Sequence, residues 1–551
     1  MNSYWIDSSQ KNNINKKIDK NYIADVCIIG AGICGLSTAY YLAKQGLKVI
    51  VVDKSELGQK ASGHTTAKIT LQHGLIYNYL INSFGFDFDM NYFEANKKAI
   101  SNIKKIIDSE NIECDFEYQD NYVYTTSKDN ILKIHDEVKA INSLSENYAQ
   151  FITNSKLPFE IAGCIQTKNQ AQFHPIKYML GLAKSIQNYG SLIFTNSLCR
   201  DVQKDKDKYV SFVNDYTISS KYVVIASHYP FINFPGFYFS KMYQATSYAI
   251  AVDTKEQLFD GMYINTSEPV LSFRTAKYNE RRLLIISGGN HKTGYSPDSD
   301  FSYGYTLLEN TAKKLYPDSK ILYKWNTRDC ITLDKVPYIG EFSKFLPNMY
   351  VATGFNKWGM TTSNIAANII SDSILGIKNN YAHIFDSSRF SPIKNRGEIK
   401  NMAEQIFHSF VSSRLKIPSE ELSSIKNDNG AIIKNNGISI GIYKNPDGKI
   451  FAVDPTCTHL GCLLTWNNLD KTWDCPCHGS RFDYTGKNLY DPAFKDLTTF
   501  FIEDTFQPKR TVPEQKGPSP NEKDRPQTKR TVPKRKGPSP NEKDRPQMKK
   551  P

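Results

Sequence analysis

The stretch DVCIIGAGICGLSTAYYLAKQGLKVIVVD, residues 25–53, decides the fold of the first part of the chain. A short apolar run leads into a glycine loop, an amphipathic segment follows, and a second apolar run ends in an acid. This order is typical of a strand, a tight turn, a helix and a second strand, in which the helix N-terminus holds a pyrophosphate. The stretch therefore predicts an α/β dinucleotide-binding domain.

Three glycines and one acid carry this prediction. Gly30 permits the tight turn, Gly32 lets backbone amides approach a pyrophosphate, and Gly35 lets the helix pack closely on the strand. Asp53, at the end of the second apolar run, can accept hydrogen bonds from a ribose diol and would repel a 2′-phosphate. These four residues are the first candidates for cofactor binding.

The chain contains a single GxGxxG unit. A reductase of the pyridine-nucleotide disulfide type normally carries a second unit for NAD(P)H, so we expect no NAD(P) site. The glycine unit by itself admits either FAD or a nicotinamide dinucleotide, because both share the adenosine diphosphate half.

Two further segments distinguish these cofactors. ASGHTTAKIT, residues 61–70, follows the glycine unit, and MYVATGFNKWGMTTSNIAANIISDSILG, residues 349–376, comes much later. In this order, the segments resemble the D-amino-acid oxidase and sarcosine oxidase superfamily of FAD enzymes, over about residues 21–395. The resemblance implies FAD as the cofactor and the oxidation of a carbon–nitrogen bond by hydride transfer to the flavin.

The resemblance also implies which residues contact FAD. In the family the late segment is a strand, a glycine turn and a helix whose N-terminus points at the flavin. Lys357 near that N-terminus would stabilise negative charge on a reduced flavin; the alternative is a solvated loop lysine without a role. No catalytic residue is named, because positioning an uncharged amine can carry much of the chemistry. The residues implied, beyond the glycine unit, are Ser62, Thr65, Thr66, Gly354, Phe355, Asn356, Lys357 and Gly359.

Residues 231–286 are rich in Tyr and Phe, with alternating apolar positions. This pattern suits an antiparallel sheet that would cap the flavin. We therefore expect an antiparallel β substrate domain inserted at about residues 160–330.

A second motif, CTHLGCLLTWNNLDKTWDCPCHGS, occupies residues 457–480. Cys457 and His459 form C-x-H, and Cys475 and His478 form C-x-x-H. Zinc fingers usually pair like ligands in each knuckle, whereas each loop here offers one thiolate and one imidazole. The mixed set favours a Rieske [2Fe-2S] centre, with two cysteines on one iron and two histidines on the other, over a zinc or purely structural module.

The surrounding residues, about 431–500, resemble Rieske proteins. In the cytochrome bc and b6f members a disulfide ties the two loops, and the resemblance carries this bond to Cys462 and Cys477. Ser480 lies where a hydroxyl in those proteins hydrogen-bonds a bridging sulfide, and Phe482 replaces the tyrosine of the high-potential members. One hydrogen bond to the cluster is then missing, so we expect a reduction potential below theirs.

The 551 residues exceed what one hydrophobic core usually serves, so we expect several domains. The predicted fold class is an α/β Rossmann-like FAD-binding domain with an antiparallel β substrate domain, a small all-β Rieske domain and a disordered basic tail. The expected parts are an N-terminal extension (1–20), the oxidoreductase body (21–395), a linker helix (396–426), the Rieske domain (427–505) and a repetitive tail (506–551).

The formal net charge of +13 belongs mostly to the tail, in which residues 508–551 carry 14 Lys and Arg against five Asp and Glu. The nearly neutral body indicates no nucleic-acid binding, although the tail could attract an anionic partner; a solvated tail without a partner is the favoured alternative. The start of the chain lacks the apolar core of a signal peptide, and no apolar run is long enough to span a membrane. We therefore expect a cytoplasmic location.

Together these features predict an FAD-dependent dehydrogenase that oxidises a small amine or amino-acid-like substrate. Electrons would leave one at a time through the cluster to an electron-transfer protein or another acceptor, since an oxidase that uses oxygen needs no cluster. Two alternatives stay open: a reductase in which electrons flow from cluster to flavin, and a non-catalytic redox sensor or scaffold. The sequence identifies neither the substrate, the acceptor nor the oligomeric state.

Overall fold

The structure is a computed structural model that describes residues 3–9, 14, 16–295, 301–389, 422–435, 437–501 and 509–510. The expected linker helix lies outside the described residues up to position 421, and so does the expected tail apart from residues 509–510. Among the described residues, no helix is long and apolar enough to cross a membrane.

The residues of the glycine motif build the centre of a mostly parallel sheet. Strand β1 (Tyr22–Ile29) pairs in parallel with β2 (Val49–Val52) on one side and with β10 (Tyr216–Ile225) on the other. The apolar residues of these strands are almost fully buried, as expected for a sheet covered on both faces. The sheet order is β16-β17-β10-β1-β2-β7, with β9 also pairing with β10 and β8 with β9. The remaining strands are β7 (Leu192–Phe194), β8 (Cys199–Asp205), β9 (Lys208–Val213), β16 (Tyr338–Glu341) and β17 (Met349–Thr353).

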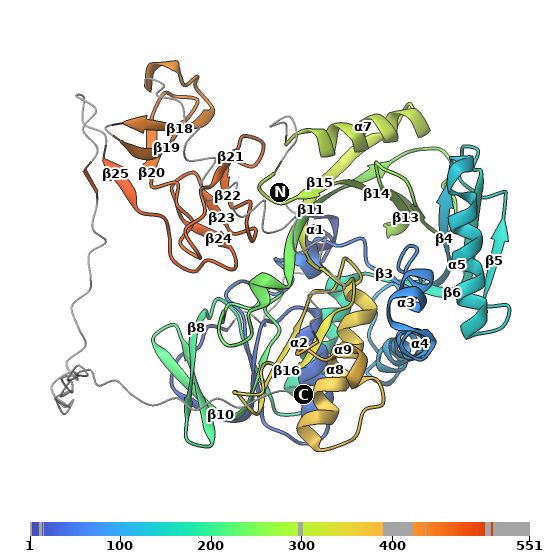
Figure 1. Cartoon of the computed structure of the whole chain (residues 1–551), viewed down its shortest axis with the longest axis horizontal. Helices are drawn as coiled ribbons and strands as arrows, with labels where there is room; N and C mark the ends of the chain where they lie inside the picture. Colours follow the sequence, from blue (N-terminus) through green and yellow to red (C-terminus); the bar gives the residue numbers. More distant parts are fainter. Residues whose placement is uncertain are drawn as a thin grey trace, which may run out of the picture. The chain divides into compact units, whose positions relative to one another are not determined.

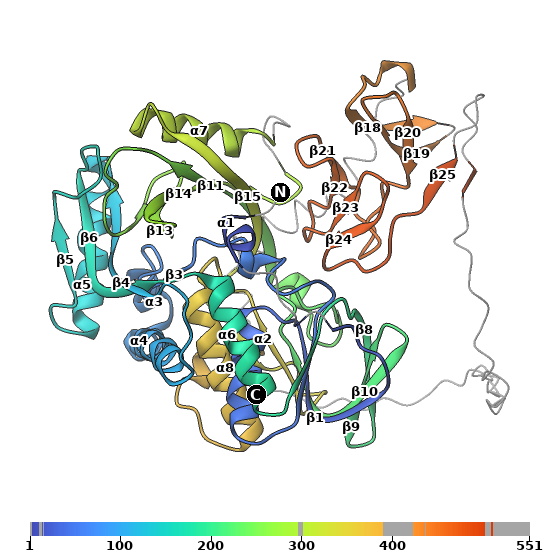
Figure 2. The same cartoon turned by 180° about the vertical axis from the view of Figure 1, so that it is seen from behind.

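Helices pack against this sheet. The helix of the glycine motif, α2 (Ile33–Lys44), lies beside α8 (Gly359–Leu375) in Figure 1 and beside α6 (Pro175–Asn188) in Figure 2. Helix α6 begins at a proline, and the side chain of the preceding His174 accepts a hydrogen bond from the Lys177 amide, so its start is capped. Strands β1 and β17 both run parallel to β10, and α2 and α8 begin shortly after them, so the first turns of these two helices lie at the same end of the sheet.

A second, nine-stranded sheet has the order β15-β11-β14-β13-β12-β4-β6-β3, with β5 on β6. Its pairs are antiparallel except for β12 with β4. The substrate domain was expected at about residues 160–330, but the sheet also includes β3, β4 and β5, which precede that range. These strands join the sheet through long-range pairing with β6 and β12. Its strands are β3 (Lys68–Ile69), β4 (Glu117–Thr125), β5 (Ala149–Ile152), β6 (Gly163–Gln172), β11 (Met242–Asp253), β12 (Met262–Asn265), β13 (Leu271–Tyr278), β14 (Arg281–Lys292) and β15 (Lys320–Thr332).

The helices not yet described are α1 (Tyr4–Asp7), α3 (Tyr77–Phe84), α4 (Phe86–Ser109), α5 (Ile131–Leu144), α7 (Tyr303–Leu315) and α9 (Ala382–Phe385). Short α1 is unusual because Tyr4 and Trp5 are both buried. The Trp5 Nε1–H donates to the Thr65 carbonyl oxygen at 2.7 Å. The N-terminal extension therefore packs onto the loop that follows the glycine motif.

The C-terminal part of the described residues contains two small antiparallel sheets. One has the order β18-β19-β20-β25-β26 and the other β21-β22-β23-β24. Cys457, Cys475, Trp473 and Phe482 share one hydrophobic cluster, so the cysteine motif forms the core of this all-β region. The strands are β18 (Asn429–Asn435), β19 (Ile438–Lys444), β20 (Ile450–Val453), β21 (Thr465–Asn467), β22 (Thr472–Asp474), β23 (Arg481–Asp483), β24 (Asn488–Tyr490), β25 (Thr499–Phe501) and β26 (Lys509–Arg510).

Candidate functional site

The glycine loop between β1 and α2 leaves no room for side chains. Gly30 has φ +112°, and a Cβ atom there would lie 2.4 Å from the Ala226 carbonyl oxygen. A Cβ atom on Gly35 would lie 1.9 Å from the Gly30 carbonyl oxygen. The loop and the first turn of α2 can approach β1 and β10 this closely only because both positions are glycine.

Asp53 braces the glycine loop from the end of β2. Its Oδ2 accepts a hydrogen bond from the Ala31 amide at 2.8 Å, and its Oδ1 accepts one from the Ser55 amide at 2.8 Å. Burial raises the pKa of this carboxyl, with the two amide hydrogen bonds opposing the shift. Each carboxylate oxygen keeps a second lone pair, so Asp53 could also accept a ribose hydroxyl.

The loop at residues 61–67 meets the first turn of α2. The Ser62 hydroxyl accepts a hydrogen bond from the Ile33 amide at 3.1 Å, and the Thr65 hydroxyl accepts one from the Ala67 amide at 2.9 Å. The Arg274 guanidinium, contributed by β13, donates to the Thr66 carbonyl oxygen at 2.9 Å. The loop is thus fixed from below by α2 and from the side by the second sheet.

The late glycine turn joins β17 to α8. Gly354 has φ +71°, and a Cβ atom there would lie 2.3 Å from the Thr332 Cγ2. Asn356 Oδ1 accepts a hydrogen bond from the Thr332 amide at 2.8 Å, which ties the turn to the end of β15. Helix α8 begins immediately afterwards at Gly359, and residues of its first turn line the same cavity as residues of the first turn of α2.

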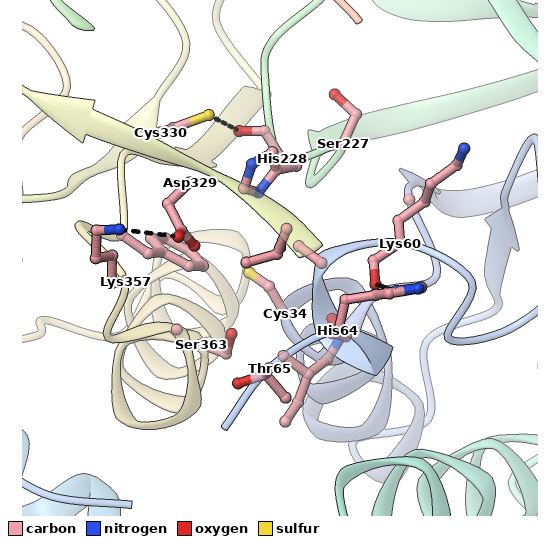
Figure 3. Close-up of a pocket in the computed structure, with 18 of the residues that line it drawn as sticks. Cys34, Lys60, His64, Thr65, Ser227, His228, Asp329, Cys330, Lys357 and Ser363 are labelled. Carbon is pink, nitrogen blue, oxygen red and sulfur yellow. Dashed lines mark hydrogen bonds and ion pairs between the residues drawn. The ribbon is translucent and has the colours of Figure 1, made fainter. Parts of the chain in front are cut away.

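Lys357 does not extend into solvent as a free loop lysine would. Its Nζ hydrogen-bonds the Ser247 hydroxyl and donates to Asn290 Oδ1 at 3.2 Å. It also lies 3.6 Å from Asp329 Oδ2, and its side chain is 34 % exposed. The dashed lines in Figure 3 mark this ion pair and the hydrogen bond from Cys330 to the His228 carbonyl oxygen. Lys357 therefore joins the α8 turn to the second sheet.

All of these segments line one cavity. Of the residues predicted to bind FAD, all but Gly35 line it; Gly35 packs behind the loop instead. Residues of the glycine loop and of the 61–67 loop line the cavity, and so do Ser247, Ser272 and Ser287 of the second sheet. Two residues of the C-terminal all-β region, Asp491 and Phe494, line it as well.

His228 is a functional candidate that the sequence reasoning missed. It lines the cavity, and its buried Nε2 has no hydrogen-bond partner among the described residues. Burial lowers the pKa of the ring, so the imidazole is neutral at pH 7. Its signal in the sequence was a polar residue directly after the apolar strand 222–226, at the carboxyl end of a parallel strand where ligands bind.

Lys68 is a further lysine side chain that lines the cavity. Its Nζ is buried, donates to the Tyr263 carbonyl oxygen at 2.7 Å and hydrogen-bonds the Ser272 hydroxyl. Burial, assisted by the nearby Arg274 guanidinium, holds the pKa of this amine well below its ordinary value. A buried lysine therefore borders the space below the second sheet.

In the all-β region the two cysteine loops lie together. The Cys457 and Cys475 sulfurs hydrogen-bond each other, which lowers the pKa of Cys457 to about 7 and raises that of Cys475. The His459 and His478 rings are 5.0 Å apart between centroids. Two sulfurs and two imidazoles are thus paired as a [2Fe-2S] cluster with mixed ligands requires.

The imidazole nitrogens fit the same role. His459 Nδ1 and both ring nitrogens of His478 are buried without a hydrogen-bond partner among the described residues. Burial lowers the pKa of His459 to about 4 and that of His478 to about 3, so both rings are neutral, the form that binds metal. Orphaned buried nitrogens are costly unless a ligand satisfies them.

A disulfide joins Cys462 to Cys477, as the resemblance to Rieske proteins implied. The sulfurs of Cys462, Cys475 and Cys477 all lie within 4.8 Å of one another, but two of them are spent in the disulfide and are not metal ligands. The Ser480 hydroxyl is fully buried, accepts a hydrogen bond from the Ala493 amide at 3.0 Å and donates one to the Cys457 sulfur. Phe482 is also fully buried and offers no donor.

Two family models match these two regions, one model for each. The family model "FAD dependent oxidoreductase" matches residues 25–373, and the model "Rieske [2Fe-2S] domain" matches residues 416–501. The chain is 36 % identical over 473 residues to the "Putative Rieske 2Fe-2S iron-sulfur protein YhfW" of Bacillus subtilis (strain 168), covering 86 % of this chain and 92 % of that protein.

Two other proteins match a smaller share of the chain. The gamma-glutamylputrescine oxidoreductase of Escherichia coli (strain K12) is 21 % identical over 71 % of this chain and 91 % of its own length. The crystal structure of glycine oxidase from Geobacillus kaustophilus superposes with a TM-score of 0.57 at 18 % identity, covering 67 % of this chain and all of that one. At 18 % identity this structural similarity supports the fold alone.

Proposed function

The chain belongs to the FAD dependent oxidoreductase family and carries a C-terminal Rieske [2Fe-2S] domain, and from this premise we propose that it is a dehydrogenase of small amines or amino-acid-like molecules. The family membership confirms the predicted enzyme class, the fold and both cofactors, FAD and [2Fe-2S]. The FAD supplies a two-electron acceptor for a hydride equivalent, and the cluster supplies a one-electron carrier. The proposed acceptor of these electrons is a separate protein or small molecule.

The shared cavity is the observation that carries this proposal. Asp491 and Phe494 of the Rieske domain line the same cavity as Gly30 and Gly354 of the oxidoreductase body. Lys54 of the body pairs with Asp491 at 2.7 Å, so the Rieske domain helps to close the cofactor cavity. A cluster module beside the flavin supports electron exchange between the two cofactors.

For FAD, we assign the pyrophosphate to the first turn of α2 and the flavin to the first turn of α8. Two helix N-termini facing one cavity favour negative charge on both groups. Asp53 would accept the ribose hydroxyls. The proposed FAD residues are Gly30, Gly32, Gly35, Asp53, Ser62, Thr65, Thr66, Gly354, Phe355, Asn356, Lys357 and Gly359.

For the substrate, we assign the space between the α8 turn and the second sheet. Lys357 and Asp329 offer both charges there, and Ser247 and Asn290 add polar groups, which suits a small amine or zwitterion. His228 Nε2 would accept the proton of a substrate ammonium and leave the uncharged amine that can be oxidised. The printed names of the two relatives support an amine, since gamma-glutamylputrescine and glycine both contain one.

For the cluster, we assign Cys457 and Cys475 to one iron and His459 and His478 to the other. The paired sulfurs and the orphaned imidazole nitrogens support this set. The disulfide between Cys462 and Cys477 would hold the two loops at the spacing the cluster needs.

The test is anaerobic stopped-flow spectroscopy of the holoenzyme against amines, amino acids and N-methyl compounds, with flavin and cluster absorbance followed separately. Flavin bleaching followed by cluster reduction is the expected result. If no compound bleaches the flavin while reduced cluster passes electrons to it, the dehydrogenase proposal fails and the reverse flow replaces it.

A further inference from the structure

One ligand histidine of the cluster site is held by the oxidoreductase body. Asn233 Oδ1 lies 2.8 Å from His459 Nε2 and can only accept, so the Nε2 carries the hydrogen. The other ring nitrogen, Nδ1, is then an unprotonated lone pair, buried without a partner among the described residues. The hydrogen bond therefore selects the tautomer in which Nδ1 can bind iron.

The same part of the body covers the histidine edge of the cluster site. The Phe239 ring lies 6.5 Å from the His459 ring and 6.0 Å from the His478 ring between centroids, nearly perpendicular to both. His478 is only 3 % exposed. Phe239 thus packs against both imidazoles, of which His478 is buried and His459 half-buried.

Close backbone approach shows that the two surfaces fit each other. Gly294 of the body has φ +75°, and a Cβ atom there would lie 2.6 Å from the Pro476 amide nitrogen. Gly479 of the cluster loop has φ +83°, and a Cβ atom there would lie 2.7 Å from the Gln244 Cβ. Neither contact tolerates a larger residue without movement.

Charged contacts surround this fit. Asp470 of the Rieske domain accepts hydrogen bonds from Arg328 of the body at 3.3 Å and from Arg481 of its own domain at 2.7 Å. Both arginine side chains are 3 % exposed. Buried ion pairs of this kind fix the geometry of the contact, because a buried charge separated from its partner would be left uncompensated.

The segment that carries Asn233 begins in the FAD cavity. Ser227, His228 and Phe231 line that cavity, and Asn233 follows two residues later at the cluster site. A single short stretch after β10 therefore touches both cofactor sites.

We propose that Asn233 is a positioning residue that docks the histidine edge of the cluster on the oxidoreductase body, so that electrons cross between flavin and cluster along residues 227–233. This inference rests on the proposed function only for the direction of flow. Each substrate oxidation releases two electrons, and each transfer changes one ferric iron of the cluster to ferrous. An outside one-electron acceptor therefore collects one electron twice in each turnover.

The hydrogen bond has a predictable effect on the cluster. An acceptor on the imidazole N–H raises the electron density and basicity of the ligating ring, which favours ferric iron. Loss of the acceptor raises the reduction potential. The Asn233→Leu variant removes the acceptor at similar volume, whereas Asn233→Asp keeps an oxygen in place.

Asn326→Leu is the matched control. The Asn326 side chain of the body contacts Asp470 of the Rieske domain at 3.3 Å but touches no ligand histidine. Each variant loses one side-chain amide that joins the oxidoreductase body to the Rieske domain. Only Asn233→Leu loses the contact to His459. Iron and FAD content identify any variant that fails to fold.

The experiment is a redox titration of the holoenzyme followed by electron paramagnetic resonance, with ferricyanide and dithionite as probes. Flash photoreduction of the flavin then gives the rate of cluster reduction without any substrate. We expect Asn233→Leu to raise the potential, shift the resonance spectrum and slow cluster reduction about tenfold. Asn233→Asp should keep a potential at or below that of the unchanged protein, and Asn326→Leu should leave the potential and spectrum unchanged.

An unchanged potential and spectrum in an Asn233→Leu protein with full iron content would overturn the inference. Equal shifts in Asn326→Leu would overturn it too, because they would show a general loss of docking. Neither result depends on an amine substrate, so the proposed function can fail separately.

Discussion

The FAD cavity and the cluster site differ in how their residues are distributed along the chain. The proposed cluster ligands are four side chains from residues 457–478, in two loops tied by one disulfide. The FAD cavity uses segments from residue 29 to residue 363 together with Asp491 and Phe494. A local site should fail alone when a ligand is lost, whereas a dispersed site should fail through residues far from the cofactor.

The largest effect is expected at a cluster ligand. Cys475→Ser should abolish cluster binding, because one iron loses a thiolate that no described neighbour outside the disulfide replaces. FAD should stay bound, since Cys475 does not line the FAD cavity. Iron analysis and the visible spectrum measure both, with Cys27→Ser as the control at a buried cysteine outside the motif. Loss of FAD together with iron would show that the two sites are not independent.

The dispersed site should be sensitive to Trp5. This ring is 1 % exposed, donates to the Thr65 carbonyl oxygen and lies 5.2 Å from the Arg274 guanidinium. Trp5→Ala should reduce the free energy of unfolding by about 3 kcal/mol and loosen FAD, because it leaves a cavity beside the 61–67 loop. Thermal unfolding and FAD release measure this, and Trp5→Phe should lose much less. Unchanged FAD affinity in Trp5→Ala would remove the link between the N-terminal extension and the loop.

The FAD body should also respond to acid through His73, which stacks on Trp358 of the α8 turn at 4.7 Å. Burial lowers the pKa of His73 to about 3, below the ordinary value of 6.5. Between these two pH values the unfolded chain binds a proton at His73 and the folded chain does not. Stability is then full above pH 6.5 and falls by up to about 1.4 kcal/mol for each pH unit between 6.5 and 3.

His73→Phe keeps a ring for the stack and removes this proton. Its free energy of unfolding should fall less steeply than that of the unchanged protein below pH 6.5, as measured by denaturant titration at several pH values. The difference between the two proteins matters, because burial raises the pKa of Asp89 to about 8 and of Glu137 to about 7, with the opposite effect on the slope. Parallel curves would mean that His73 takes up its proton in the folded state.

The smallest effect is expected at Phe482, inside the local site. Phe482→Tyr supplies a hydroxyl that can donate to the cluster or a ligand sulfur, and it should raise the reduction potential without changing iron content. Phe482→Leu adds no donor and should give no such rise. A potential already at the upper end of the Rieske range in the unchanged protein would contradict the expectation.

The cluster motif could be interpreted from sequence because its information is local. The spacing of Cys457, His459, Cys475 and His478 puts both ligand types in each loop, and the structure brings these side chains together. The glycine motif was similarly clear. Gly30 and Gly35 are required by close contacts within one strand–turn–helix unit and with the segment after the neighbouring strand. The cluster followed from its ligand motif, whereas FAD in place of a nicotinamide followed only from the family resemblance of residues 61–70 and 349–376. Both cofactors and the fold class are confirmed.

Other features were not accessible in this way. His228 becomes a candidate only because β10 pairs beside β1 and delivers it to the cavity. Lys357 was left between a flavin contact and a solvated lysine, and its contacts to Ser247, Asn290 and Asp329 come from three strands of the second sheet. The Trp5 and Arg274 contacts to the 61–67 loop join residues far apart in the chain.

The sequence by itself thus determined the two cofactor motifs, because backbone geometry and ligand spacing act over a few residues. The tertiary structure decided which distant side chains complete each site, because strand pairing and domain packing depend on the whole hydrophobic pattern at once. The Asn233 contact to His459 belongs to this second group: 226 residues separate the two, and no local pattern marks either as the partner of the other.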